Sequence, residues 1–259
     1  MAAWLRLFRV VNLPTVPGDA LVGAGAVMWS LAPLSPPEFA AVAMTAAASC
    51  LLYMFGLVDN DIVGAATDRG RPIPDGEISL RSARLARALC LALGLALPAA
   101  VAALPMSSGL AVPTAASEIF VALALVAAIV AYNRRKRPLA MGLCRGLNVL
   151  FGSTSVLPLI LWPRVLMRMP VVVCIVVLAA LLWTVYIAAV TKYSEGEEAD
   201  PARRRRVGML IGGIVYLQIA ALAVLTLHSR SVSPLLLASG VMLVLLRVLK
   251  TLLPGVRAS

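Results

Sequence analysis

The chain contains a succession of apolar segments, each about as long as a helix that crosses a lipid bilayer. A hydrocarbon core about 30 Å thick requires roughly 20 apolar residues per helical span. The segments fall near residues 15–34, 38–58, 83–104, 115–133, 139–162, 170–191, 207–227 and 233–253. The chain is 61% hydrophobic and only 14% charged, and this excess has to face lipid because soluble domains carry about a quarter charged residues. The sequence therefore predicts an all-α fold, a polytopic membrane helical bundle of about eight or nine transmembrane helices, with residues 1–259 as a single integral membrane domain.

Basic residues are strongly biased toward one side of this predicted bundle. If the N-terminus is cytoplasmic, 20 of the 23 Lys and Arg residues lie on the cytoplasmic side, and only Arg164, Arg168 and Arg230 lie outside. Positive charge collects in cytoplasmic loops, so this asymmetry predicts an even number of spans with both termini in the cytoplasm. We expect a bacterial inner (cytoplasmic) membrane. The net charge of +11 then reflects topology and contact with anionic lipid heads, and not nucleic-acid binding.

Acidic residues are concentrated in two of the predicted cytoplasmic loops. Nine of the twelve lie there, namely Asp59, Asp61, Asp68, Asp75 and Glu77 after the second span and Glu195, Glu197, Glu198 and Asp200 after the sixth. The rule that places basic residues inside requires no carboxylates. The two acidic loops therefore suggest two halves of similar layout that face one cavity.

The segment that follows the second span carries the most unusual pattern. Asp61 and Asp68 are seven residues apart, a spacing that returns to the same face of a helix, and Asn60 lies on an adjoining stripe. Carboxylates in such a place favour Mg²⁺, which proteins hold with one or two carboxylates plus substrate phosphates. Arg69 and Arg71 follow and could bind phosphate oxygens with paired donors. A solvated loop with incidental salt bridges is the alternative interpretation.

These residues resemble the first signature of the UbiA superfamily of membrane prenyltransferases. The matching positions are Asn60, Asp61 and Asp68, followed by the run Arg71-Pro72-Ile73-Pro74-Asp75-Gly76-Glu77-Ile78-Ser79. Arg9 and Asn12 resemble the Arg-x-x-Asn start of that superfamily, and residues 131–137 and 141–148 look most like its EboC-like branch. The likeness follows the order of the chain over most of its length.

The resemblance implies a ring of helices around a cavity open toward lipid, with Mg²⁺ and a prenyl diphosphate at the cytoplasmic mouth. The expected activity is Mg²⁺-dependent transfer of an isoprenoid group from a prenyl diphosphate to an unidentified acceptor. The resemblance makes Asn60, Asp61 and Asp68 the candidate catalytic and metal-binding residues. The candidate diphosphate-binding residues are Arg9, Asn12, Arg71, Lys136, Arg137, Arg145, Asn148 and Lys192. A second acidic cluster, formed by Ser194, Glu195, Glu197, Glu198 and Asp200, stands in place of the second signature.

The chain departs from the family pattern in ways that keep a second interpretation open. Gly64 stands where the signature has its middle aspartate, the second cluster lacks the usual spacing, and a ninth span is not evident. The alternative is a catalytically degenerate UbiA-like protein that binds or moves a lipid-like metabolite. A conventional transporter is less favoured, because Asp19 and Arg145 are the main charges near the membrane midplane.

Two further features lie within the predicted spans. Arg145 and Asn148 share one face of the fifth span, and charged residues inside spans usually face the protein interior. The alternative is that Arg145 extends its guanidinium to the membrane surface. Two glycine pairs with G-x-x-x-G spacing, Gly142 with Gly146 and Gly208 with Gly212, predict close helix contacts.

Overall fold

The computed structural model describes residues 2–30, 34–66, 68, 70–106, 110–157, 169–195, 200–229 and 232–252, and every regular element in these ranges is a helix. The long helices are α2 (Val16–Met28), α3 (Pro36–Val63), α4 (Leu80–Ala100), α5 (Ala111–Arg135), α6 (Pro138–Thr154), α7 (Met169–Ser194), α8 (Pro201–His228) and α9 (Ser233–Leu252). The short α1 (Ala2–Leu7) and the 3-10 helices η1 (Leu13–Thr15) and η2 (Val101–Ala103) complete the set.

Six helices of the described chain are long and apolar enough to cross a membrane, and they are α3, α4 extended through Ala103, α5, α7, α8 and α9. The sequence prediction of about eight spans is therefore confirmed only for these six. The other two predicted spans correspond to α2, with 13 residues, and α6, with 17. At a rise of 1.5 Å per residue these two helices extend over about 20 and 26 Å, which is less than the hydrocarbon thickness. The predicted outer end of the fifth span, residues 158–162, lies outside the described residues.

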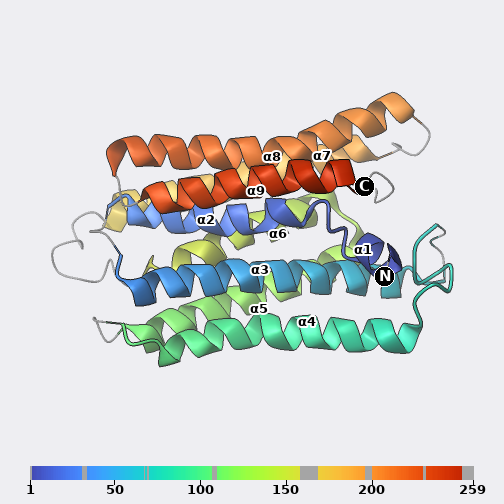
Figure 1. The fold of residues 1–259 in the computed structure, drawn as a ribbon, viewed down its shortest axis with the longest axis horizontal. Helices are drawn as coiled ribbons and strands as arrows, with labels where there is room; N and C mark the ends of the chain where they lie inside the picture. The colour runs from blue at the N-terminus through green and yellow to red at the C-terminus, as the bar shows by residue number, and fades with distance from the viewer. Residues whose placement is uncertain are drawn as a thin grey trace.

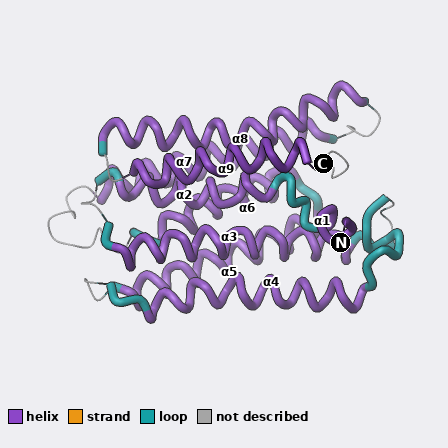
Figure 2. Tube along the Cα trace, in the orientation of Figure 1, coloured by secondary structure: helices purple, strands orange, loops and turns teal. Residues whose placement is uncertain are grey.

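The long helices run roughly parallel to one another in three groups (Figure 1). The helices α7, α8 and α9 lie on one side, α2 and α6 lie in the middle, and α3, α4 and α5 lie on the other side. The short helix α1 and the last turn of α9 lie at the same end of the bundle (Figure 1). The loop between α3 and α4 also lies at this end (Figure 2). The sequence predicts the N-terminus and the loop after the second span on one side, and the described helices agree; residues 253–259 lie outside the described chain.

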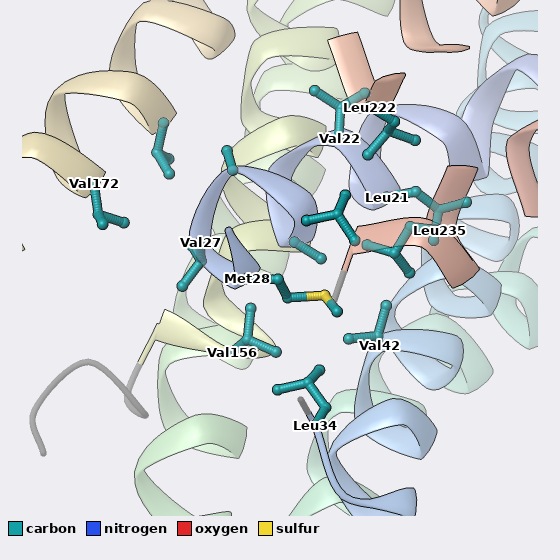
Figure 3. Packing of buried hydrophobic residues seen from close by; sticks show 14 residues of the cluster. Leu21, Val22, Val27, Met28, Leu34, Val42, Val156, Val172, Leu222 and Leu235 are labelled. Atoms are coloured by element: carbon teal, nitrogen blue, oxygen red, sulfur yellow. The ribbon is translucent and has the colours of Figure 1, made fainter. Parts of the chain in front are cut away.

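Helix α2 lies at the centre of the bundle, and all thirteen of its residues are buried. Leu21, Val22, Val27 and Met28 belong to an apolar core that also includes Leu222 from α8 and other side chains from α3, α7 and α9 (Figure 3). A helix that is enclosed on all sides by other helices does not need a lipid-facing surface. This enclosure explains why a helix too short to match the bilayer is stable here.

Close packing of α6 against α7 depends on glycine. A Cβ atom added at Gly142 would lie 2.2 Å from the carbonyl oxygen of Thr184, and one at Gly146 would lie 2.1 Å from its Oγ1. The close contact predicted for this pair is thus confirmed. The prediction for the second pair was wrong at Gly208, where a Cβ would meet no atom of the described residues within 4 Å. The spacing alone does not say which face of a helix meets a neighbour.

Candidate active site

A cavity of about 310 Å³ opens among α2, α3, α5 and α6, and its lining includes Arg9 and residues of the loop between α3 and α4. That loop lies at the end of the bundle that carries the N-terminus (Figure 2). Apart from Asn133, the cavity's charged, amide and serine residues form two groups, which we call the mouth and the inner end. The mouth consists of Arg9, Asn60, Asp68, Arg71 and Lys136, and the inner end consists of Ser49, Arg145 and Asn148. The wall between them is mainly apolar and aromatic, with Leu57, Leu125, Ile129, Met141, Tyr53 and Tyr132.

The last turn of α3 carries three consecutive polar residues whose side chains point in three different directions, because successive residues on a helix differ by about 100° in direction. Asp59 accepts hydrogen bonds from Arg87 Nη1 at 3.0 Å and from Asn133 Nδ2 at 2.9 Å. Asn60 lines the cavity, and Asp61 pairs with Arg71. The anchoring of Asp59 to α4 and α5 therefore fixes the rotation of α3 that places Asn60 at the mouth.

Arg71 joins the two candidate metal-binding carboxylates. Its Nη1 lies 2.8 Å from Asp61 Oδ1 and 3.3 Å from Asp68 Oδ2. The loop that carries it is held under the bundle by Ile73 and Ile78, which are buried against α1 and α3. Two carboxylates and one guanidinium are thus fixed in one place, and the guanidinium also lines the cavity.

Two further cations reach the mouth from strained backbone positions. Arg9 has φ 43° and Lys136 has φ 51°, in the left-handed region that costs a residue with a Cβ about 1–2 kcal/mol. Such strain persists where the surrounding structure imposes it, and it is frequent at ligand sites. Burial, together with the nearby positive charges of Arg71 and Arg9, lowers the pKa of Lys136, and the carboxylates of Asp68 and Asp61 oppose this shift. A site that lowers the pKa of a lysine in this way favours an added anion.

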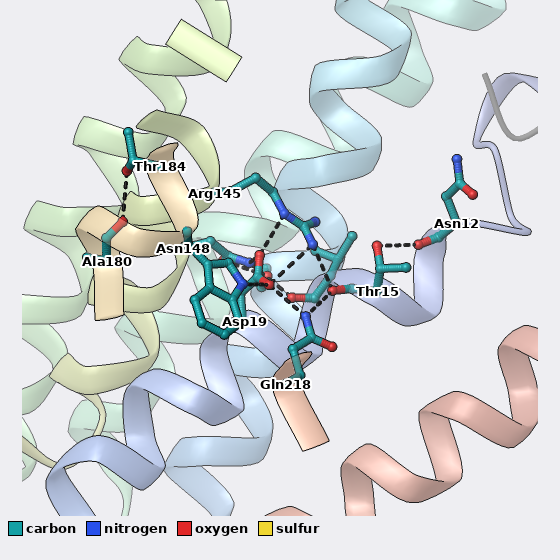
Figure 4. Close-up of polar contacts among 11 residues, drawn as sticks. Asn12, Thr15, Asp19, Arg145, Asn148, Ala180, Thr184 and Gln218 are labelled. Carbon is teal, nitrogen blue, oxygen red and sulfur yellow. Dashed lines mark hydrogen bonds and ion pairs between the residues drawn. The ribbon is translucent and has the colours of Figure 1, made fainter. Parts of the chain in front are cut away.

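The inner end is connected to a buried network centred on Asp19 of α2 (Figure 4). Asp19 is fully buried, and its Oδ2 lies 2.7 Å from Arg145 Nε. Its Oδ1 accepts hydrogen bonds from Gln218 at 2.6 Å and from Trp183 at 2.8 Å. Asn148 Nδ2 lies 3.4 Å from Oδ2 and 3.0 Å from the carbonyl oxygen of Val16. Helices α2, α6, α7 and α8 are therefore joined through one carboxylate, and Arg145 points inward instead of toward the membrane surface.

The remaining candidate residues lie away from the cavity, as far as the chain is described. Asn12 is buried and Arg137 is exposed, and neither lines the cavity. Lys192 pairs with Glu195 at 2.6 Å, and both side chains are mainly exposed. Ser194 donates to the carbonyl oxygen of Thr191, and Asp200 caps the start of α8. Glu197 and Glu198 lie outside the described residues.

The described residues bring only the first acidic loop to the cavity. None of the described lining residues comes from α7, α8 or α9. Nor do three His, Cys, Asp or Glu residues come together as a metal-binding group within the described ranges. The expectation that two acidic loops face one cavity stays a prediction, and it now concerns Glu197 and Glu198.

Neither a search with protein-family models nor a search of curated proteins finds a match to this sequence. The solved structures do provide matches. A UbiA homologue from Archaeoglobus fulgidus bound to DMAPP and Mg²⁺ matches with a TM-score of 0.53 at 18% identity, over 96% of this chain and 87% of that one. The same homologue bound to GPP and Mg²⁺ matches with a TM-score of 0.52 at 17% identity, over 98% of this chain and 87% of that one.

The chain has the fold of the UbiA homologues. A structure of digeranylgeranylglyceryl phosphate synthase also matches, with a TM-score of 0.52 at 16% identity, over 99% of this chain and 96% of that one. This UbiA-like fold extends over nearly the whole chain. It agrees with the fold that the sequence resemblance implied.

Some residues of the site were not expected from the sequence. Tyr53 and Ser49 line the cavity, yet they lie in an ordinary apolar helix and carry no motif of their own. Asn133 also lines the cavity; it belongs to the 131–137 segment that the resemblance singled out, but no role was assigned to it. Gln218 and Trp183 bind Asp19 from 199 and 164 residues away in the chain. The signals that could have pointed to this network were Asp19 and Arg145, two charges inside apolar segments that require buried partners.

Proposed function

We propose that the protein is a UbiA-like membrane prenyltransferase that transfers an isoprenoid group from a prenyl diphosphate to an acceptor. The observation that carries the proposal is the cavity, which has cations, a carboxylate and an amide at its mouth and an apolar wall behind them. Such a site matches a molecule with an anionic head and a hydrocarbon tail. The fold supports this reading, because the matched homologue is bound to GPP or DMAPP with Mg²⁺ in two of its structures.

The mouth has the charge balance that a diphosphate requires. Arg9, Arg71 and Lys136 supply three positive charges, and Asp68 supplies one negative charge. Asp61 does not line the cavity but supplies a second negative charge behind it, where it pairs with Arg71. The excess positive charge attracts the anion, and guanidinium groups bind phosphate oxygens with paired hydrogen bonds. Binding also releases Lys136 from the repulsion of its cationic neighbours.

Mg²⁺ fits the oxygen atoms available at the mouth. Asn60 is only 8% exposed, and within the described structure its Oδ1 has no hydrogen-bond partner. A buried carbonyl oxygen without a donor suits a cation. Together with Asp61 and Asp68 it makes an all-oxygen set of the kind that holds Mg²⁺ with substrate phosphates. The bound ion would neutralise charge on the leaving diphosphate.

The chain's own residues then prepare the donor for transfer. Arg9, Arg71 and Lys136 stabilise the charge that develops as the bond between C1 and the diphosphate oxygen breaks. The diphosphate leaves with the electron pair, C1 takes an electron pair from the acceptor, and the acceptor loses a proton. Tyr53 and Tyr132 bring aromatic rings to the cavity, and such rings stabilise a nearby cation. The apolar wall keeps water away from that cation.

Finer features belong to the same proposal. We infer eight spans, with α2 and α6 counted among them, in a bacterial cytoplasmic membrane with both termini and both acidic loops in the cytoplasm. Glu197 and Glu198 remain candidates for a second set of metal ligands. The EboC-like branch is the proposed placement within the superfamily.

A second candidate function follows from Gly64. A Cβ atom at this position would lie 2.5 Å from Asp68 Oδ2, so the carboxylate of Asp68 stands beside the place where the family's middle aspartate would begin. A site with one carboxylate fewer favours a protein that binds a phosphorylated lipid without breaking it. Binding without turnover distinguishes this candidate from the first.

Turnover by the purified full-length protein in lipid nanodiscs tests the proposal. We expect Mg²⁺-dependent consumption of at least one among dimethylallyl, geranyl and longer prenyl diphosphates. Asp68→Asn should reduce it at least tenfold, whereas Asp75→Asn, which alters an exposed carboxylate of the same loop, should not. Binding without consumption would favour the second candidate, and no binding of any donor would refute both.

A further inference from the structure

Two basic side chains of α9 lie on the outer surface of the bundle, next to α8. Arg247 and Lys250 are both exposed, and α8 and α9 run side by side (Figure 1). The two residues are three apart on one helix, so their side chains lie on the same face. None of the described lining residues of the cavity comes from either helix, so this surface is separate from the candidate active site.

Arg247 is attached to the backbone below the level of the lipid head groups. It follows Ser233, the first residue of α9, by fourteen residues, which corresponds to about 21 Å along the helix axis. The hydrocarbon layer is about 30 Å thick, so with Ser233 at one boundary this backbone position lies about 9 Å inside the other. An exposed charge at this depth is costly unless its long side chain reaches an anion or water at the membrane surface.

The chain itself provides no anion to this cation. Arg247 Nη2 donates a hydrogen bond to the phenolic oxygen of Tyr216 on α8, and the guanidinium carbon lies 5.9 Å from the centre of that ring. Within the described residues no carboxylate forms an ion pair with Arg247 or Lys250. Because the hydroxyl of Tyr216 accepts from the guanidinium, its own hydrogen is available for a second acceptor. Two cations and a phenol therefore offer hydrogen-bond donors to an added anion.

A glycine of α8 brings the second cation to the same place. The ammonium nitrogen of Lys250 lies 3.0 Å from the position that a Cβ on Gly212 would occupy, so it rests against α8 where no side chain covers the backbone. Gly212 precedes Tyr216 by four residues, which is one turn on the same face of α8. Lys250 therefore lies about one turn nearer the membrane surface than Arg247 and Tyr216.

Exposed apolar side chains surround this polar group. Val244 and Val248 flank Arg247 on α9 and are 61% and 43% exposed, and Leu217 follows Tyr216 on α8 and is 44% exposed. Guanidinium and ammonium groups bind phosphate with charge-assisted hydrogen bonds. A phosphate held by both cations directs attached acyl chains along these apolar side chains. The surface thus matches a molecule with a phosphate head and hydrocarbon chains.

We propose that Arg247, Lys250 and Tyr216 form a binding site for one anionic phospholipid, whose phosphate meets the two cations and accepts from the phenol. The head group carries no ammonium of its own, because the two cations of the site would repel it. Phosphatidylglycerol has this chemistry, and phosphatidylcholine does not. The site lies outside the cavity, so this proposal does not depend on the proposed function.

Native mass spectrometry of the full-length protein tests the site. The protein in neutral detergent is titrated with phosphatidylglycerol or with phosphatidylcholine of the same acyl chains, and the Kd of the first bound lipid is measured. We expect phosphatidylglycerol to bind at least tenfold more tightly. Arg247→Gln/Lys250→Gln should weaken its binding at least tenfold and change phosphatidylcholine binding less than twofold. Tyr216→Phe keeps the ring and removes the hydroxyl, and it should weaken phosphatidylglycerol binding about threefold.

The matched control is Arg81→Gln/Arg84→Gln. It removes two exposed arginines that are also three apart, from the first turns of α4 beside the loop between α3 and α4. It lowers the net charge by the same amount, and it should change the phosphatidylglycerol Kd less than twofold. Equal weakening by the two double variants, or no preference for phosphatidylglycerol, would overturn the proposal, because binding would then not depend on this site.

A second measurement locates the lipid without any substitution. The protein in phosphatidylcholine nanodiscs is illuminated with a small share of a phosphatidylglycerol analogue that carries a diazirine on its acyl chain close to the ester. We expect labelling around Leu217, Val244 and Val248, which added unlabelled phosphatidylglycerol suppresses. Labelling spread evenly over the spans, or confined to the wall of the cavity, would overturn the proposal.

Discussion

Replacing Arg145 with Met while leaving Asp19 in place removes the cation from a fully buried ion pair. The loss of one partner of such a pair typically costs 3–5 kcal/mol, because the other charge stays buried without compensation. Gln218, Trp183 and Asn148 still donate hydrogen bonds to Asp19, so we expect the lower end of this range, about 3 kcal/mol. The double variant Asp19→Asn/Arg145→Met carries no buried charge, and its amide oxygen can still accept from Gln218 and Trp183. We therefore expect it to be more stable than the single variant by about 1–2 kcal/mol.

The free energy of unfolding is measured by titrating detergent micelles of the purified protein with SDS and following the helical circular dichroism. Arg205→Met, at an exposed position on α8, serves as the control and should change this free energy by less than about 0.5 kcal/mol. A loss below about 1 kcal/mol for the single variant would refute the reasoning, because it would mean that Asp19 is not held as a buried anion. The reasoning would also be refuted if Asp19→Asn/Arg145→Met were no more stable than Arg145→Met alone.

Three further predictions concern packing, metal and pH. Gly142→Ala should destabilise the protein by about 1–3 kcal/mol in the same unfolding assay, because its Cβ would lie 2.2 Å from a backbone oxygen of α7. Gly208→Ala is the control and should not destabilise it, because no atom of the described chain lies within 4 Å of the added Cβ; equal effects of the two substitutions would contradict the packing. Removal of Mg²⁺ with EDTA should weaken binding of the dimethylallyl diphosphate thio-analogue at least tenfold by calorimetry, and an unchanged Kd would argue against a metal at the mouth. The pKa of Lys136 is lowered, so its side chain loses its positive charge at a lower pH than an ordinary lysine does. The affinity for the diphosphate analogue should therefore fall as the pH rises through that pKa. Lys136→Arg should flatten that profile, and a profile shared by both proteins would refute the assignment.

Much of the architecture could be predicted from the sequence because membrane insertion imposes a simple rule on each segment. The apolar windows at 38–58 and 115–133 correspond to α3 and α5, since a lipid-facing helix must be apolar along its whole length. The same rule was less informative for the window at 15–34, where α2 ends at Met28. A buried helix is also apolar, so hydropathy alone does not separate a spanning helix from one enclosed by its neighbours.

The mouth of the cavity could be predicted in part, because several of its residues are close together in the sequence. Asn60, Asp68 and Arg71 lie within twelve residues of one another, so a local pattern reveals them. The partner of Asp19 could not be found in this way, because Arg145 lies 126 residues further along the chain and the pairing depends on how α2 packs against α6. Ser49 was missed because a single serine in an apolar helix commonly bonds to its own backbone.

Photolabelling tests most directly whether the cavity holds a prenyl diphosphate. The full-length protein in nanodiscs is illuminated with Mg²⁺ and a geranyl diphosphate analogue that carries a diazirine on its hydrocarbon tail, and labelled residues are identified by mass spectrometry. The account predicts labelling of the apolar wall around Leu57, Leu125 and Ile129, which unlabelled geranyl diphosphate suppresses and Asn60→Ala reduces. Labelling confined to the lipid-facing surfaces of α8 and α9, or unaffected by competitor, would contradict it.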